Sequence, residues 1–156
     1  MKKATVIGLG RSGIAAAKLL TKHGYTVTLS DSNHSPSLEI QKQELETLGI
    51  NVKLGDKFTP TTEDIIVVSP GVPWDIVPLV TARAMGIDTI GEVELAWRYL
   101  NDIPWVAITG TNGKTTTTAL TDAIFKAAGL ETIGCGNIGF AACELALLET
   151  DRKSVV

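Results

Sequence analysis

The stretch Ala4-Thr-Val-Ile-Gly-Leu-Gly-Arg-Ser-Gly13 decides the fold. Its first four residues have the apolar composition of a buried strand, and its three glycines form the pattern G-x-G-x-x-G. Directly after a strand, this pattern predicts a tight turn into a helix. Apolar residues at helical spacing follow as far as Gly24, and residues 25–29 are typical of the next strand. The beginning of the chain is therefore a βαβ unit.

Strands and helices continue to alternate up to residue 100. The sequence predicts strands over residues 51–54, 64–68 and 88–90, and helices over residues 38–48, 76–85 and 92–100. This alternation is typical of a parallel sheet covered by helices. We predict an α/β fold, with a Rossmann-like parallel-sheet domain over residues 1–92.

Two features lie where the crevice of such a sheet is expected. Asp31 follows the second strand, where an acidic residue commonly binds a ribose hydroxyl in dinucleotide folds. The turn Ser69-Pro-Gly-Val-Pro73 ends a buried strand and is expected on the same rim as Gly8. Two interpretations stay open from these residues: an NAD site, or glycines and prolines that only shape turns and helix packing.

A second glycine-rich loop, Thr109-Gly-Thr-Asn-Gly-Lys-Thr-Thr116, follows an apolar run that predicts a strand. Apolar residues at helical spacing come after it, with Thr118 on the opposite, polar side. The loop has the short form G-x-x-G-K-[ST], because Ile108 replaces the first glycine of the longer phosphate-binding pattern. Its N–H groups would bind phosphate oxygens, Lys114 would supply a positive charge and Thr115 a Mg²⁺ ligand. The alternative is a turn that binds no ligand.

This loop belongs to a second α/β unit, for which we predict residues 93–156 and a P-loop ATPase-type fold. The unit continues with a short strand near residue 132, a turn over residues 134–139 and a helix over residues 141–148. Residues 154–156 read as the first residues of a buried strand. Because a parallel sheet of about two strands leaves its faces poorly covered, we expect a truncated domain.

Composition limits the class of protein. The chain has 156 residues, of which 44% are hydrophobic and 20% charged, and a net charge of -3. These values favour one or two compact cytoplasmic domains and argue against a nucleic-acid partner, and no transmembrane segment is expected. Cys135 and Cys143 have neither zinc-site spacing nor an obvious pairing, so we expect reduced thiols. No role is assigned to His23 or His34.

Over nearly its whole length, the chain resembles the Mur ligases of peptidoglycan synthesis. Five motifs in this order carry the resemblance: Gly8-Leu-Gly-Arg-Ser-Gly13, Ser69-Pro-Gly-Val-Pro73, Gly91-Glu-Val-Glu-Leu95, Thr109-Gly-Thr-Asn-Gly-Lys-Thr-Thr116 and Gly136-Asn-Ile-Gly139.

The resemblance implies that the first domain binds the UDP part of a substrate in place of NAD. The residues that it places at this substrate are Arg11, Ser12, Asp31, Ser32, Gly71 and Asn137. It implies ATP and Mg²⁺ at the second loop, where the matching residues are Gly110, Thr111, Asn112, Gly113, Lys114, Thr115 and Thr116. Lys114 would have the catalytic role of offsetting charge on the transferred phosphoryl group, and Thr115 would hold the metal.

The implied chemistry is ATP-driven amide formation. The carboxylate of UDP-N-acetylmuramoyl-L-alanine would attack the γ-phosphate of ATP, and the amine of D-glutamate would displace phosphate from the resulting acyl phosphate. Further residues of the family's active site fall beyond Val156, so a chain of this extent is expected to be inactive. Two other classes remain open: an NAD-dependent sensor or oxidoreductase domain with a phosphate-binding loop, and an interaction module without a ligand.

Overall fold

The protein is described by a computed structural model over residues 1–136, 139–148 and 154–155. A five-stranded parallel sheet forms its larger part, with the strand order β3-β2-β1-β4-β5. The strands are β1 (Lys3–Ile7), β2 (Thr26–Asp31), β3 (Asn51–Leu54), β4 (Ile65–Val68) and β5 (Asp88–Gly91). The chain order reverses between β1 and β4, so the carboxyl ends of these strands flank the switch point where open α/β sheets bind ligands. The predicted α/β class is confirmed.

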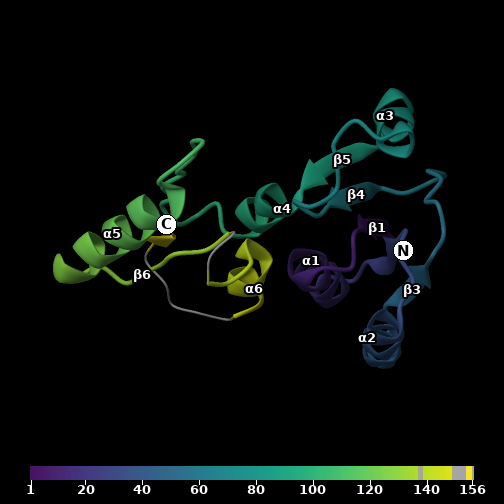
Figure 1. Ribbon diagram of the computed structural model, residues 1–156, viewed down its shortest axis with the longest axis horizontal. Coiled ribbons are helices and arrows are strands. Elements are labelled where there is room, and N and C mark those ends of the chain that lie inside the picture. The colour runs from purple at the N-terminus through teal and green to yellow at the C-terminus, as the bar shows by residue number, and fades with distance from the viewer. Residues whose placement is uncertain (137–138, 149–153, 156) are drawn as a thin grey trace.

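Helices cover the sheet unequally (Figure 1). One face carries α1 (Arg11–Lys22), α2 (Pro36–Thr47) and α4 (Glu92–Tyr99), which enclose the larger apolar core. Leu19, Leu20, Leu29 and Leu95 are almost completely buried in this core, and each such side chain stabilises the fold by roughly 1.5–3 kcal/mol. The other face has a smaller core under α3 (Val77–Ala84), around Ile66 and Leu79.

The connection from β3 to β4 contains no helix. Residues 55–64 cross back to the start of β4 as an irregular segment, in which Phe58 packs against the smaller core. A helical crossover needs about a dozen residues or more, so this segment is too short to contain one. It leaves part of the sheet beside β1 and β2 without a helix, and brings Phe58 to the carboxyl edge of the strands.

The remainder of the described chain contains α5 (Lys114–Ala127), β6 (Thr132–Ile133), α6 (Ala142–Leu147) and β7 (Ser154–Val155). Strands β6 and β7 pair in parallel as a separate two-stranded sheet. Figure 1 shows α5 and β6 projecting from the larger part, whereas α6 lies beside α1 and α4. Ala142, Cys143 and Leu145 of α6 are buried in the larger core.

Two expectations for this region are wrong. The apolar run before the phosphate loop forms no strand, since residues 106–110 have no regular structure. A strand needs a paired neighbour, and β6 pairs with β7. Helix α5 forms as predicted, but its buried residue is Thr118, while Leu120 and Ile124 of the apolar stripe are 60% and 56% exposed. The stripe lacks a cover because α5 makes few contacts beyond β6.

No helix in the described ranges is both long and apolar enough to cross a membrane.

Candidate functional site

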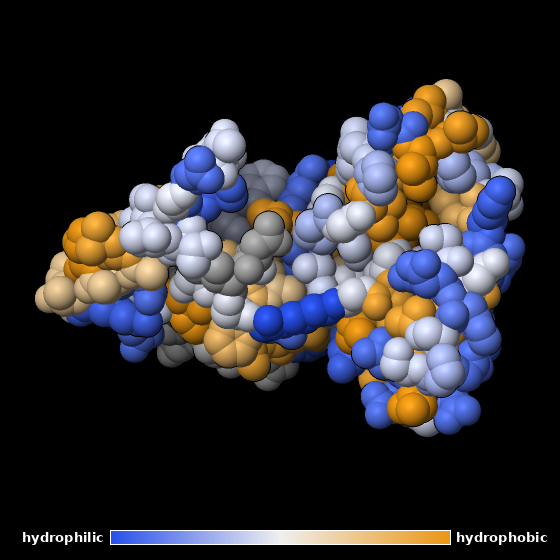
Figure 2. Space-filling model, viewed as in Figure 1, coloured by the Kyte–Doolittle hydropathy of each residue, from blue (hydrophilic) through white to orange (hydrophobic). Residues whose placement is uncertain are grey.

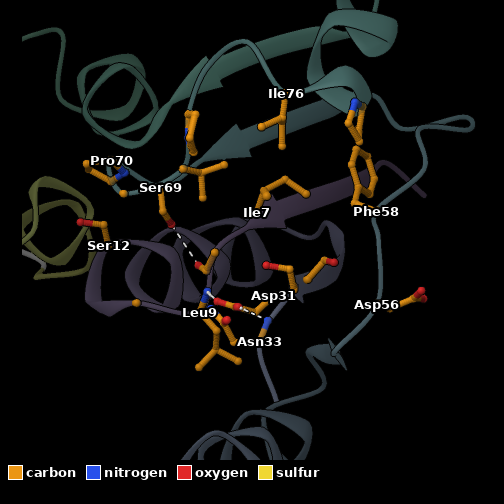
Figure 3. A pocket seen from close by; sticks show the side chains of 18 of the residues that line it. Ile7, Leu9, Ser12, Asp31, Asn33, Asp56, Phe58, Ser69, Pro70 and Ile76 are labelled. Carbon is orange, nitrogen blue, oxygen red and sulfur yellow. Dashed lines mark hydrogen bonds between the residues drawn. The ribbon is translucent and has the colours of Figure 1, made fainter. Parts of the chain in front are cut away.

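A cleft of about 800 Å³ lies at the carboxyl ends of β1, β2 and β4. The turn after β1, the end of β2 and the turn after β4 form its walls, as expected for the switch point of the sheet (Figure 3). Five residues predicted to contact the substrate line it: Arg11, Ser12, Asp31, Ser32 and Gly71. The sixth, Asn137, lies outside the described residues.

The floor of the cleft depends on the close approach of three segments: the turn after β1, the start of α1 and the turn after β4. The buried hydroxyl of Ser69 donates a hydrogen bond of 3.0 Å to the carbonyl oxygen of Gly8, which links the turn after β4 to the turn after β1. Gly8 has a φ of +99°, and a Cβ atom at Gly13 would lie 1.9 Å from the Gly8 oxygen. The glycine pattern is therefore required for the helix to begin against the strand.

Asp31 shapes the wall of the cleft at the end of β2. Its carboxylate accepts hydrogen bonds from the backbone N–H groups of Leu9, at 2.7 Å, and Asn33, at 2.8 Å. Each carboxylate oxygen thus holds one loop in place, and Figure 3 shows Leu9 and Asn33 on either side of Asp31. The remaining lone pairs are the part of Asp31 that a ligand can use.

The N-terminus of α1 faces the same cleft. Gly10 is the N-cap residue and provides no side-chain cap, and the first backbone bond of the helix runs from Ile14 to Gly10. The N–H groups of Arg11, Ser12 and Gly13 therefore have no partner within the helix. Unpaired N–H groups and the positive end of the helix dipole make this end suited to an anion such as phosphate.

The side chain of Arg11 is engaged outside its own helix. Its guanidinium forms an ion pair with Glu144 of α6, with 3.0 Å between Nη2 and Oε2. This hydrogen-bonded pairing raises the pKa of Arg11 and is the main cause that lowers the pKa of Glu144. The sequence alone gave no signal for this pairing, because the two residues are 133 positions apart.

The opposite wall of the cleft is apolar, and no role was predicted for its residues. Phe58, Val72 and Ile76 line it and pack against the smaller core. In Figure 3, Phe58 and Ile76 lie on the far side of the cleft from Asp31. The signal that identifies Phe58 is the length of the connection between β3 and β4, which is too short for a helix and must cross the sheet edge as a loop.

The second glycine-rich loop is exposed and does not line the cleft. Helix α5 begins at Lys114 after Gly113, which has a φ of +79°. The Lys114 ammonium group donates hydrogen bonds to the carbonyl oxygens of Gly110 and Thr111. The first backbone bond of the helix runs from Thr117 to Gly113, so the N–H groups of residues 114–116 have no partner within the helix.

Curated relatives carry one shared name. The chain is 66% identical over 159 aligned residues to the UDP-N-acetylmuramoylalanine–D-glutamate ligase of Gloeothece citriformis, covering 100% of the chain and 35% of the relative. It is 63% identical to the ligase of the same name from Microcystis aeruginosa, covering 94% of the chain and 33% of the relative. The chain thus spans about a third of the length of these relatives.

Solved structures show the same fold. A pseudomurein peptide ligase type C from Methanothermus fervidus matches with a TM-score of 0.56 and 29% identity, over 100% of the chain and 32% of that protein. The UDP-N-acetylmuramate-alanine ligase of Thermotoga maritima matches with a TM-score of 0.54 and 23% identity, over 85% of the chain and 31% of that protein.

Residues 2–91 match the family described as Mur ligase MurD-like, N-terminal domain. These residues contain the whole five-stranded sheet and all the lining of the cleft. The chain therefore belongs to the MurD-like family of Mur ligases.

Proposed function

We propose that the cleft binds the uridine diphosphate part of UDP-N-acetylmuramoyl-L-alanine, and that the chain is part of an ATP-dependent ligase that joins this substrate to D-glutamate. The supporting observation is the meeting of the G-x-G turn, Asp31 and the turn at Ser69 around one cavity of about 800 Å³. This volume lies within the usual range for small-molecule sites. Membership of the family and the name of the relatives support the choice of substrate.

Each wall of the cleft has a role in the proposal. The diphosphate would accept hydrogen bonds from the N–H groups of Arg11 and Ser12 at the start of α1. The uracil or ribose would lie near Asp31 and Ser32, and Gly71 would present its backbone to the substrate. Asn137 would reach the sugar and diphosphate from the turn before α6.

The hydrogen bonds of Asp31 limit how a ribose can bind at this wall of the cleft. In dinucleotide enzymes, the acidic residue at this position accepts hydrogen bonds from ribose hydroxyls. Here both carboxylate oxygens already accept a backbone N–H group, from Leu9 and Asn33. Asp31 therefore has reduced capacity for a ribose with two hydroxyl donors, whether the ribose belongs to UDP or to NAD, and the choice of UDP is supported by the family and by the name of the relatives.

The loop at residues 110–116 is proposed to hold ATP and Mg²⁺. ATP would supply the γ-phosphate that activates the substrate carboxylate. The unpaired N–H groups at the start of α5 suit phosphate oxygens, Lys114 would offset their charge, and the Thr115 hydroxyl would contribute to the metal site. Domain limits of 1–92 and 93–156 belong to the same proposal.

Thermal unfolding of the chain with three separate ligands tests the proposal: UDP-N-acetylmuramoyl-L-alanine, NAD and Mg-ATP. At a hundredfold excess over Kd, a specific ligand stabilises the folded state by about 2.7 kcal/mol. For a chain of this length, the melting temperature then rises by roughly 5–10 °C. We expect this rise with the UDP substrate and its absence with NAD.

Substitutions in the cleft, outside it and at the second loop locate the response. Ser12→Ala and Ser32→Ala change the lining of the cleft and should reduce the shift produced by the UDP substrate, whereas Thr47→Ala, at the exposed end of α2, should leave it unchanged. Lys114→Ala should abolish only the rise in melting temperature that Mg-ATP produces. Stabilisation by NAD and not by the UDP substrate would overturn the proposed function.

A further inference from the structure

Glu144 does not line the cleft, but it forms an ion pair with Arg11, which does. Nε of Arg11 is 3.3 Å from both carboxylate oxygens of Glu144, and Nη2 is 3.0 Å from Oε2. The third nitrogen of the guanidinium, Nη1, has no hydrogen-bond partner in the part of the chain that the structure describes. Arg11 is thus bound to Glu144 through one edge, and its other N–H groups remain for a further acceptor.

Glu144 is itself fixed in place. Its Oε2 atom also accepts the backbone N–H of Ala141, at 2.8 Å, so it caps the helix on which it lies. Helix α6 is anchored to α4 by buried Cys143, whose N–H donates to Oε1 of Glu92 at 2.6 Å. The carboxylate of Glu144 therefore has a defined position relative to α1 and α4.

We propose that Glu144 is a positioning residue for substrate binding, which orients the Arg11 guanidinium so that Nη1 binds a phosphate oxygen of the UDP diphosphate. This inference rests on the proposed function of the cleft. Arginine recognises phosphate through several N–H groups in a fixed plane, and a guanidinium that is already oriented loses less conformational freedom on binding. Arg11 also separates the negative charge of Glu144 from that of the diphosphate.

Isothermal titration calorimetry on the full 156-residue chain tests this role, with UDP-N-acetylmuramoyl-L-alanine, UDP and uridine as ligands. Glu144→Gln should weaken binding of the two diphosphates about three- to fivefold, the scale of a partly exposed ion pair, and leave uridine binding unchanged. The matched control is Glu94→Gln, which removes a carboxylate that is ion-paired with Arg98 on the exposed face of α4.

A second variant keeps α6 intact. Arg11→Lys retains the positive charge and leaves the bond from Glu144 to the Ala141 N–H in place, but its single nitrogen lacks the fork that binds two acceptors in a plane. It should weaken diphosphate binding by a similar factor. Because the two residues act as one unit, the double variant should lose little more than either single variant.

The outcomes separate the possibilities. If Glu144→Gln weakened the binding of uridine and of the two diphosphates equally, Glu144 would have a role in folding alone, and the inference would be overturned. Unchanged or tighter diphosphate binding would overturn it as well, because Glu144 would then be neutral or a competitor for Arg11. If the unaltered chain bound none of the three ligands, the proposed function of the cleft would fail, and the inference with it.

Discussion

Gly13 is the residue on which the cleft most depends, because α1 begins in contact with the turn after β1. We expect Gly13→Ala to lower the free energy of unfolding by about 3 kcal/mol, at the upper end of the range for overpacked sites. The reason is that the new Cβ atom would lie 1.9 Å from the Gly8 oxygen and 2.7 Å from Oγ of Ser69. Urea unfolding followed by circular dichroism measures the change.

Gly10→Ala is the matched control for this prediction. Gly10 belongs to the same motif, has a negative φ and would place its Cβ atom in open space. Its substitution should change the free energy of unfolding by less than about 0.5 kcal/mol. Similar losses for the two variants would mean that the contact between Gly13 and Gly8 is not what stabilises the motif.

Glu92 should make stability depend on pH. Glu92 is 2% exposed, and burial raises the pKa of its carboxyl group above the usual 4.5, although the N–H of Cys143 acts in the opposite direction. The folded protein therefore binds this proton more readily than the unfolded chain, so the contribution of Glu92 to the free energy of unfolding decreases as pH rises from 4.5 through the folded pKa.

Glu92→Gln removes this titration while an amide oxygen remains to accept the Cys143 N–H. The stability of Glu92→Gln relative to the original chain should increase as pH rises across that window and then stay constant. Urea unfolding between about pH 4 and pH 8 measures this difference, with Glu94→Gln as the control on the exposed face of α4. A constant or decreasing difference would contradict the raised pKa.

Helices α5 and α6 both lie in the last third of the chain, but only α6 is packed into the larger core. Leu145 of α6 is 2% exposed, whereas Leu120 of α5 is 60% exposed. Leu145→Ala should lower the free energy of unfolding by about 2–4 kcal/mol, because it leaves a cavity in the larger core. Leu120→Ala should change it by less than about 0.5 kcal/mol.

Both values come from one series of denaturant unfolding curves. If Leu120→Ala were as costly as Leu145→Ala, the apolar stripe of α5 would be packed in solution. Figure 2 shows apolar surface at the outer end of α5, in agreement with an uncovered stripe that includes Leu120 and Ile124; Leu130, just after the helix, is exposed as well.

The sequence was most informative about elements whose pattern is local. Helix α1, the parallel strands and the rim that joins Gly8 to Ser69 follow from apolar periodicity and turn residues, and five of the six predicted substrate residues line one cleft. The strand expected at residues 106–108 depends on neighbouring strands, which periodicity does not reveal. The roles of Phe58 and Glu144 depend on contacts between distant segments, so they become visible only in the fold.

At the scale of the whole molecule, α6 joins the part of the chain after residue 100 to the larger core. It packs on α1 and α4 and carries Glu144 to Arg11. The larger core therefore extends past the predicted limit at residue 92, to include α4 and α6. The division of the chain into two domains stays a prediction. If residues 93–156 form a second domain, α6 is the element that links this domain to the cleft, through Glu144 and Arg11.

Chemical-shift mapping by NMR, with UDP-N-acetylmuramoyl-L-alanine added to the isotope-labelled chain, tests the position of the substrate site most directly. We expect the largest changes at the backbone amides that surround the cleft, in residues 8–12, 31–33 and 69–72, with α5 unaffected. Changes confined to other surfaces, or none at saturating substrate, would contradict the assignment of this cleft to the UDP part of the substrate.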